Sequence, residues 1–195
     1  MVKDTAMKQL LVLSSFITGS SFLILTTSPS SPETTKRLFK RLDAASSPVG
    51  NVSIIIDKSD YELSVYDDKG WYATYPVVFG NNSLDDKKVA GDKNTPEGNF
   101  RINSKRVHEK WYRFLAIDYP TKESWEKFNQ RKQRGEIPAS ASIGGSIGIH
   151  GTWPNEDFVI DKYKNWTLGC ISMKRDDVDE IYKFTPIGTR VTIRK

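Results

Sequence analysis

Hydrophobic runs separated by short polar segments make up the stretch from Val52 to Gly80. It reads "VSIIIDKSDYELSVYDDKGWYATYPVVFG" and contains three runs rich in β-branched and aromatic residues. The segments "DKSD" and "DDKG", with the Asp and Gly typical of hairpin turns, separate these runs. The pattern therefore predicts a meander of three consecutive antiparallel strands.

The rest of the chain mixes strand-like and helix-like segments. After a polar loop, "FRINSKRV" and "RFLAIDY" read as strands, and a helix is predicted from Thr121 through "TKESWEKFNQRKQRG". A glycine-rich strand "GGSIGIHG" follows, then a loop with Cys170, a helix "VDEIYKF" capped by Asp176 or Asp177, and a last strand "GTRVTIRK". We expect a mainly β domain with a few helices.

The N-terminal 25 residues follow a different pattern. Two lysines precede a charge-free stretch from residue 10 to residue 25. This stretch is shorter than the roughly 20 residues that span a bilayer, which is typical of a signal peptide, with an N-terminal membrane anchor as the alternative. Residues 26–50 are rich in Ser, Thr and Pro and read as a linker with a short helix at 35–42, and residues 51–195 read as one folded domain.

The composition narrows the class of protein. Hydrophobic residues make up 37% of the chain and charged residues 27%, which is apolar enough for a packed core. The formal net charge is +5, but no nucleic-acid-binding motif accompanies the basic residues, and "KFNQRKQRGE" reads as a solvated helix face. We expect no nucleic-acid partner, and an exported domain would work in the periplasm or cell wall.

The chain has one cysteine, Cys170, within "NWTLGCISM". In an oxidising compartment an unpaired cysteine is a dimer link, a small buried apolar residue or a reactive thiol. Gly169 allows a tight turn beside the sulfur, and a histidine is the usual base for such a thiol. His108 lies in the charged segment "SKRVHEKW" and is expected on the surface, whereas His150 ends the glycine-rich strand and is the better candidate.

The motifs around this pair resemble a known family. "IHG", then "TLGCIS" after sixteen residues between His150 and Thr167, resembles the signature of the L,D-transpeptidase catalytic domain, or YkuD domain, and "GDKNTPEGNFRI" resembles its Thr-Pro-x-Gly-x-Phe segment. Leu168 stands where the family usually has a second histidine, and Ser172 where it usually has Arg or Asn. "GCISM" followed by "DDVDEIY" is similar to the YafK-like subgroup, whose members are associated with cutting links to peptidoglycan.

The resemblance implies a β-sandwich or mixed-sheet domain that acts in cell wall biogenesis and cell shape without a cofactor or a metal. The implied substrates are peptidoglycan stem peptides, with an amine or a wall-linked lipoprotein as acceptor or partner. Cys170 would attack the diaminopimelate carbonyl to form a thioester, and His150, oriented by the Gly151 carbonyl, would hold the thiol proton. The implied oxyanion and orienting residues of the loop are Thr167, Leu168 and Gly169.

Other residues near these motifs are candidates for contacts in the cleft. Trp153 and Trp166 flank the site in sequence and, with Ser172, are candidate substrate contacts. Three turn-forming residues, Asp92, Thr95 and Pro96, are expected to shape a loop near the cleft.

Several other functions remain open from the sequence. A hydrolase of the same family would release a D-amino acid or a peptidoglycan-linked protein, and a non-catalytic wall-binding module would leave Cys170 inert. A papain-like protease is disfavoured because its cysteine precedes its histidine. A zinc site is a further alternative, although its spacing matches no structural zinc pattern; its ligands would be His150, Asp157, Asp161 and Cys170.

Overall fold

The computed structural model describes residues 47–195. The predicted signal peptide or anchor at residues 1–25, the short helix at 35–42 and most of the linker at 26–50 lie outside the described residues, so these expectations and the extracytoplasmic location stay predictions. Within the described part, the helices are too short or too polar to cross a membrane. The domain expected from residue 51 begins with strand β1 (Ser53–Asp57).

The first three strands form the predicted meander. β1 pairs antiparallel with β2 (Glu62–Asp67), which pairs antiparallel with β3 (Gly70–Val78). Every second residue of β1 and β2 points into the core, with Ile54 opposite Val65 and both residues at most 1% exposed. The β-rich runs and the turn segments therefore predicted the three strands, and the structure shows which of their faces is buried.

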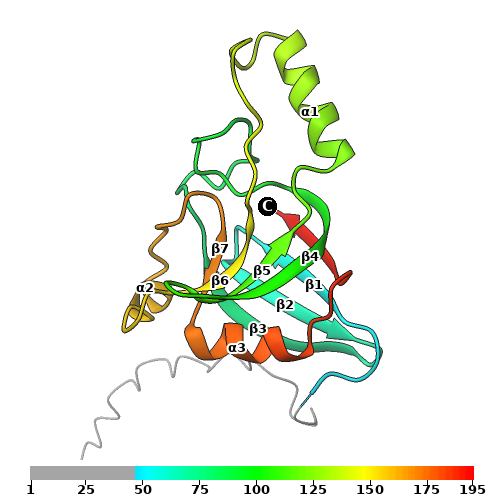
Figure 1. Cartoon of the computed structure of the whole chain (residues 1–195), viewed down its shortest axis with the longest axis vertical. Helices are drawn as coiled ribbons and strands as arrows, with labels where there is room; N and C mark the ends of the chain where they lie inside the picture. Colours follow the sequence, from blue (N-terminus) through cyan, green and yellow to red (C-terminus); the bar gives the residue numbers. More distant parts are fainter. Residues whose placement is uncertain (1–46) are drawn as a thin grey trace, which may run out of the picture. The chain divides into compact units, whose positions relative to one another are not determined.

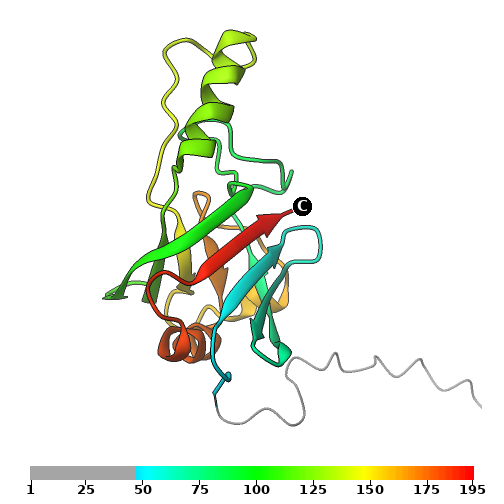
Figure 2. The same ribbon diagram turned by 90° about the vertical axis from the view of Figure 1, so that its right-hand side faces the viewer.

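The eight strands close into a barrel in the order β1-β2-β3-β7-β6-β5-β4-β8. β8 closes the ring by pairing parallel with β1 and antiparallel with β4, and Figure 2 shows β8 beside both strands. β6 and β7 are also parallel, so the predicted mainly β, mixed-sheet class is confirmed, with the sheet closed on itself instead of split into two layers. The remaining strands are β4 (Gly98–His108), β5 (Tyr112–Ile117), β6 (Gly148–Gly151), β7 (Ile171–Met173) and β8 (Arg190–Arg194).

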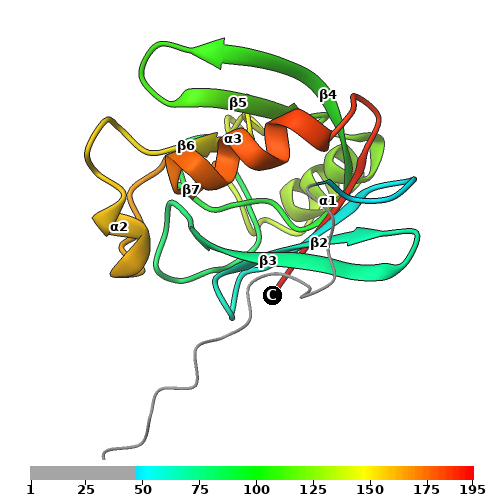
Figure 3. The same cartoon turned by 90° about the horizontal axis from the view of Figure 1, so that it is seen from below.

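The helices are α1 (Lys122–Gln133), α2 (Phe158–Asp161) and α3 (Arg175–Phe184). α1 begins as predicted, because the Thr121 hydroxyl caps it by accepting the N–H of Ser124 at 3.2 Å. In Figure 1, α1 and α3 lie at opposite ends of the barrel. Figure 3 shows α3 running across its end.

α3 seals that end of the barrel with Val178 and Ile181, which are fully buried. Its N-cap is Lys174, so the cap predicted at Asp176 or Asp177 is wrong. Both carboxylates lie in the first helical turn instead, where the helix dipole favours negative charge. The helix begins earlier than predicted, because only Lys174 lies between the end of β7 and the start of α3.

Candidate active site

A cleft of about 460 Å³ opens beside the short strands β6 and β7, and both Cys170 and His150 line it. A volume of several hundred Å³ is typical of sites for small ligands or short peptide segments. Its walls come from the β4–β5 hairpin, the segment before β6 and the loop before β7. The lining residues are Arg106, Trp111, Phe114, Gly145, Ser146, Ile147, His150, Trp166, Thr167, Leu168 and Cys170.

Strand register brings the thiol and the imidazole to the same face of the sheet. β6 lies between β5 and β7, so that Phe114, His150 and Ser172 stand in one row across three strands. Paired residues on neighbouring strands point to the same face, as do residues two apart along a strand. Cys170 directly precedes β7 and is two residues from Ser172, which places it on the side of the sheet that His150 faces.

The imidazole of His150 is held in one orientation and one tautomer. Its Nδ1 lies 2.8 Å from the carbonyl oxygen of Gly151, and because a carbonyl can only accept, Nδ1 carries the proton. Trp111 and Phe114 stack on the ring at centroid distances of 4.7 and 5.9 Å, and Trp166 meets it edge-on at 5.6 Å. The orienting contact predicted for Gly151 is present, and Nε2 keeps a free lone pair.

Burial keeps this imidazole neutral. His150 is 1% exposed, and its desolvation lowers its pKa to about 4, against the opposing effect of the hydrogen bond to Gly151. At neutral pH the ring is therefore an uncharged base that can accept a proton at Nε2.

Cys170 carries a protonated thiol at neutral pH. Burial raises the pKa of the thiol above its ordinary value, and a backbone hydrogen bond from Gly148 and the charges of Lys87 and Arg106 only partly oppose this. The thiol donates a hydrogen bond of 3.5 Å to the carbonyl oxygen of Ser146. Such a thiol needs a base at the moment of attack, because only the thiolate is a strong nucleophile.

The loop that carries Cys170 is anchored at the end of β3. The side-chain oxygen of Asn165 accepts the backbone N–H of Phe79 at 2.7 Å. The Phe79 carbonyl in turn accepts the N–H groups of Trp166 and Thr167 at 2.9 and 3.1 Å. These contacts tie the start of the loop to the end of β3.

Thr167 and Gly169 shape the turn into Cys170. The Thr167 hydroxyl donates to the Cys170 carbonyl at 2.7 Å and accepts the N–H of Gly169 at 3.1 Å, and it thereby links the two ends of the turn. Gly169 has a φ of +122°, and a Cβ atom there would lie 2.8 Å from the carbonyl oxygen of Asn94. The loop therefore approaches a neighbouring segment too closely for a side chain at this position.

That neighbouring segment is the loop predicted at Asp92, Thr95 and Pro96. The Asp92 carboxylate accepts the backbone N–H groups of Val89 and Asn94, both at 3.0 Å, and pairs with the buried Lys87 at 2.8 Å. These contacts hold the Asn94 carbonyl against Gly169. The loop thus packs against the turn that leads into Cys170.

Replacing Gly169 with alanine is expected to lower the free energy of unfolding by about 2 kcal/mol and to reduce activity. The new Cβ would combine an unfavourable positive φ with the contact to Asn94. Gly70→Ala is the matched control, because Gly70 has a φ of +100° and open space around it. Denaturant unfolding of both variants measures the difference, and an equal loss of stability in the two would contradict the role of the contact.

Of the other residues predicted near the site, some line the cleft and others do not. Trp166 lines the cleft, and Leu168 is 76% exposed at its rim. Trp153 lies outside the cleft, with the Lys110 ammonium 5.5 Å from its ring. Ser172 is fully buried, and its hydroxyl has no hydrogen-bond partner among the described residues. Trp153 and Ser172 are therefore not part of the lining of the cleft.

Sequence reasoning missed the wall formed by the β4–β5 hairpin. Arg106, Trp111 and Phe114 reach the cleft from this hairpin, and Phe114 does so because it pairs with His150. His108 was expected on the surface but is half-buried, with its ring stacked on Trp111 at 4.3 Å. The only local signal was the strand pattern itself, which does not show that β5 pairs with β6.

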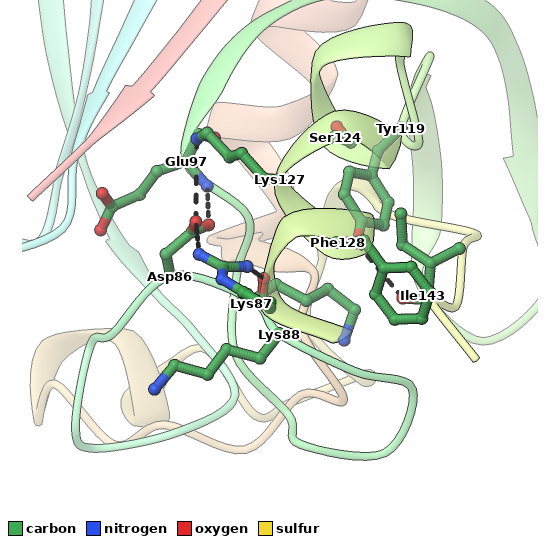
Figure 4. Close-up of a pocket in the computed structure, with 10 residues that line it drawn as sticks. Asp86, Lys87, Lys88, Glu97, Tyr119, Ser124, Lys127, Phe128 and Ile143 are labelled. Atoms are coloured by element: carbon green, nitrogen blue, oxygen red, sulfur yellow. Dashed lines mark hydrogen bonds and ion pairs between the residues drawn. The ribbon is translucent and has the colours of Figure 1, made fainter. Parts of the chain in front are cut away.

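A much smaller cavity, of about 10 Å³, lies between α1 and the loop before β4 (Figure 4). Asp86 accepts from Arg131 on α1 at 2.7 Å and lies 3.7 Å from Lys127 on the same helix. A cavity of this size holds at most about one water molecule. Its charged residues therefore attach α1 to the loop before β4.

The described residues do not form the alternative zinc site. In residues 47–195, no group of three or more His, Cys, Asp or Glu side chains is placed to hold a metal ion. Asp157 accepts a hydrogen bond from the Thr152 hydroxyl, and Asp161 pairs with Lys174 at 2.5 Å. These two carboxylates thus have structural partners of their own.

Comparison with known proteins finds similarity over most of the described domain. Residues 51–193 match the family described as the L,D-transpeptidase catalytic domain, YkuD. The chain is 30% identical over 149 residues to "Putative L,D-transpeptidase YqjB" of Bacillus subtilis (strain 168), which covers 74% of this chain and 72% of that protein.

Solved structures show the same fold at lower sequence identity. One is the helical cell shape determining protein Pgp2 of Campylobacter jejuni, with a TM-score of 0.53 and 20% identity over 81% of this chain and 50% of that one. Another is Bd1075 of Bdellovibrio bacteriovorus, with a TM-score of 0.51 and 17% identity over 80% of this chain and 51% of that one. The chain spans about half the length of these two structures, and the likeness concerns the fold.

Proposed function

Because the chain belongs to the L,D-transpeptidase catalytic domain (YkuD) family, we propose that it transfers acyl groups between peptidoglycan stem peptides through a thioester on Cys170. The observation that carries this proposal is the cleft shared by Cys170 and His150, in which the Gly151 carbonyl leaves Nε2 of the imidazole as the free base. The family supports the substrate class, and the geometry of the cleft supports the chemistry.

In the first half-reaction, the Cys170 sulfur attacks the carbonyl carbon of a diaminopimelate residue in the donor stem peptide. As the S–C bond forms, the thiol proton leaves the Ser146 carbonyl and moves to Nε2 of His150. The C–N bond then breaks, and the imidazolium gives the proton to the departing amine of the D-amino acid. The products are a thioester on Cys170 and a free D-amino acid.

The negative oxygen of the tetrahedral intermediate needs hydrogen-bond donors from the same loop. The N–H of Gly169 is engaged by the Thr167 hydroxyl, which leaves the N–H groups of Leu168 and Cys170 as the candidate donors. Thr167 and Gly169 act as positioning residues in this mechanism, because their hydrogen bonds set the turn from which those two groups project.

In the second half-reaction, an acceptor amine attacks the thioester and gives its proton to neutral His150. The C–S bond breaks, and the sulfur leaves and regains a proton from the imidazolium. Water in place of the amine would release a free acid, which is the reaction of a hydrolase. The apolar side chains of Trp111, Phe114 and Ile147 along the cleft favour transfer to an amine, because they restrict the water that reaches the thioester.

Incubation of the purified protein with disaccharide-tetrapeptides tests the proposal directly. We expect an acyl adduct on Cys170 in the intact-protein mass, release of D-alanine, and dimers cross-linked between two diaminopimelate residues. If tripeptides form but dimers do not, even with added D-amino acids as acceptors, the protein is a hydrolase and not a transferase. Binding of peptidoglycan without any adduct or product would instead identify a wall-binding module with an inert thiol.

A further inference from the structure

The cleft contains an arginine that the mechanism above does not use. Arg106 lies near the end of β4 and lines the same cleft as Cys170. Its guanidinium carbon lies 4.4 Å from the centroid of the Phe114 ring, and Phe114 stacks on His150 with an interplanar angle of 8°. The cation is therefore one aromatic ring away from the proposed general base.

Arg106 is a charged residue in an otherwise uncharged cleft. Among the described residues, it also lacks the carboxylate partner that other arginines of the domain have. Of the described residues that line the cleft, Arg106 alone carries a positive charge at neutral pH, because burial keeps His150 neutral. Arg113 and Arg131 pair with carboxylates at 2.8 and 2.7 Å. No carboxylate within residues 47–195 forms such a pair with Arg106, which is exposed at the cleft. The cleft thus presents an unpaired cation on an apolar wall.

Because Ser172 is buried, Arg106 is the better candidate for binding an anion in the cleft. Ser172 is the polar residue of β7 (Ile171–Met173), and its short side chain is 0% exposed. β7 therefore supplies no side chain that can hold an anion in the cleft. Arg106 enters the cleft from β4, and its charge also acts on the sulfur, because it opposes the rise in the pKa of Cys170.

We propose that Arg106 binds a carboxylate of the donor stem peptide and thereby selects donors that carry it as the free acid. A guanidinium suits this role because its planar set of donors matches a carboxylate in a two-point pair, and the apolar wall limits competition by water. The donor offers this group at two places near the reacting carbonyl, on the leaving D-amino acid and on the second centre of diaminopimelate. The inference rests on the proposed acyl transfer and adds its specificity-determining residue.

The test compares wild-type protein, Arg106→Gln and Arg106→Lys on three donors: the tetrapeptide acid, its C-terminal amide, and the tetrapeptide amidated at the second centre of diaminopimelate. Loss of a charged two-point contact is expected to lower kcat/KM for the acid about 10- to 100-fold in Arg106→Gln, mainly through KM. Arg106→Lys is expected to recover part of this loss. Arg190→Gln is the matched control, because Arg190 is an exposed arginine that does not line the cleft.

The three donors also identify the carboxylate that Arg106 binds. One of the two amidated donors should react slowly with wild-type protein, and its kcat/KM should hardly change in Arg106→Gln. The carboxylate that is amidated in that donor is the one that Arg106 binds. An equal loss on all three donors, or no loss on any, with unchanged melting temperature, would overturn the role of Arg106 while leaving acyl transfer intact. If none of the three donors acylates the wild-type protein, the proposed function itself is overturned, and not only the role of Arg106.

Discussion

Replacement of Cys170 with alanine is expected to abolish acyl transfer, with a loss of at least about 1,000-fold in D-alanine release and no acyl adduct in the intact-protein mass. The reason is that the sulfur is the only thiol in the chain and the only atom to which the mechanism attaches the acyl group. Mass spectrometry of the protein and of the muropeptides measures both outcomes in one reaction.

The same variant should remain folded, which makes the loss interpretable. The Cys170 side chain is only partly buried, and its hydrogen bond to the Ser146 carbonyl is long, at 3.5 Å. We expect the free energy of unfolding to change by less than about 1 kcal/mol. Thermal unfolding provides the check, and a folded Cys170→Ala protein that still releases D-alanine within tenfold of wild type would rule out the thioester.

Replacement of His150 with glutamine is expected to lower kcat/KM by roughly 100- to 10,000-fold, which is the usual contribution of a general base. The wild-type pH profile gives an independent readout. Since burial lowers the pKa of His150 to about 4, the base stays unprotonated above that pH, and activity should fall as the pH drops through about 4. An exposed histidine would lose its base function near pH 6.5 instead.

His108 provides the matched control for this prediction. It is the other histidine of the chain, its ring stacks on Trp111 away from the lining of the cleft, and its Nδ1 accepts the backbone N–H of Lys110 at 3.2 Å. His108→Gln should cost less than about tenfold in kcat/KM and shift the acidic limb slightly upward, because His108 lowers the pKa of His150. An acidic limb at pH 6.5 in wild type, or equal losses in both variants, would contradict the role of His150.

The pattern of the sequence predicted those elements whose residues face two different environments. β1 and β2 alternate because one face packs on the core and the other does not, and α1 has a threonine cap at its start. β7 and α2 escaped prediction for a physical reason. They contain three and four residues, and every residue of β7 is buried, so no period of two can appear in it.

The candidate site divides in the same way. The identities of Cys170 and His150 were evident from residue chemistry and from the family motif, because a thiol and a base are properties of single side chains. Their protonation states were not, since these depend on burial and on contacts such as that between His150 and Gly151. The burial of Ser172 and the entry of Arg106 into the cleft likewise follow from packing between strands distant in sequence.

The sequence by itself determined the strand-rich class, the meander, the first helix, the candidate pair of Cys170 and His150, and the family. Only the tertiary structure decided that β8 returns to β1 and closes the barrel, that the hairpin wall covers the imidazole, and that an unpaired guanidinium lines the same cleft as the thiol. The physical reason is range: propensity and alternation act between residues a few positions apart, whereas barrel closure, desolvation and the charge of a cleft depend on segments that meet only after folding.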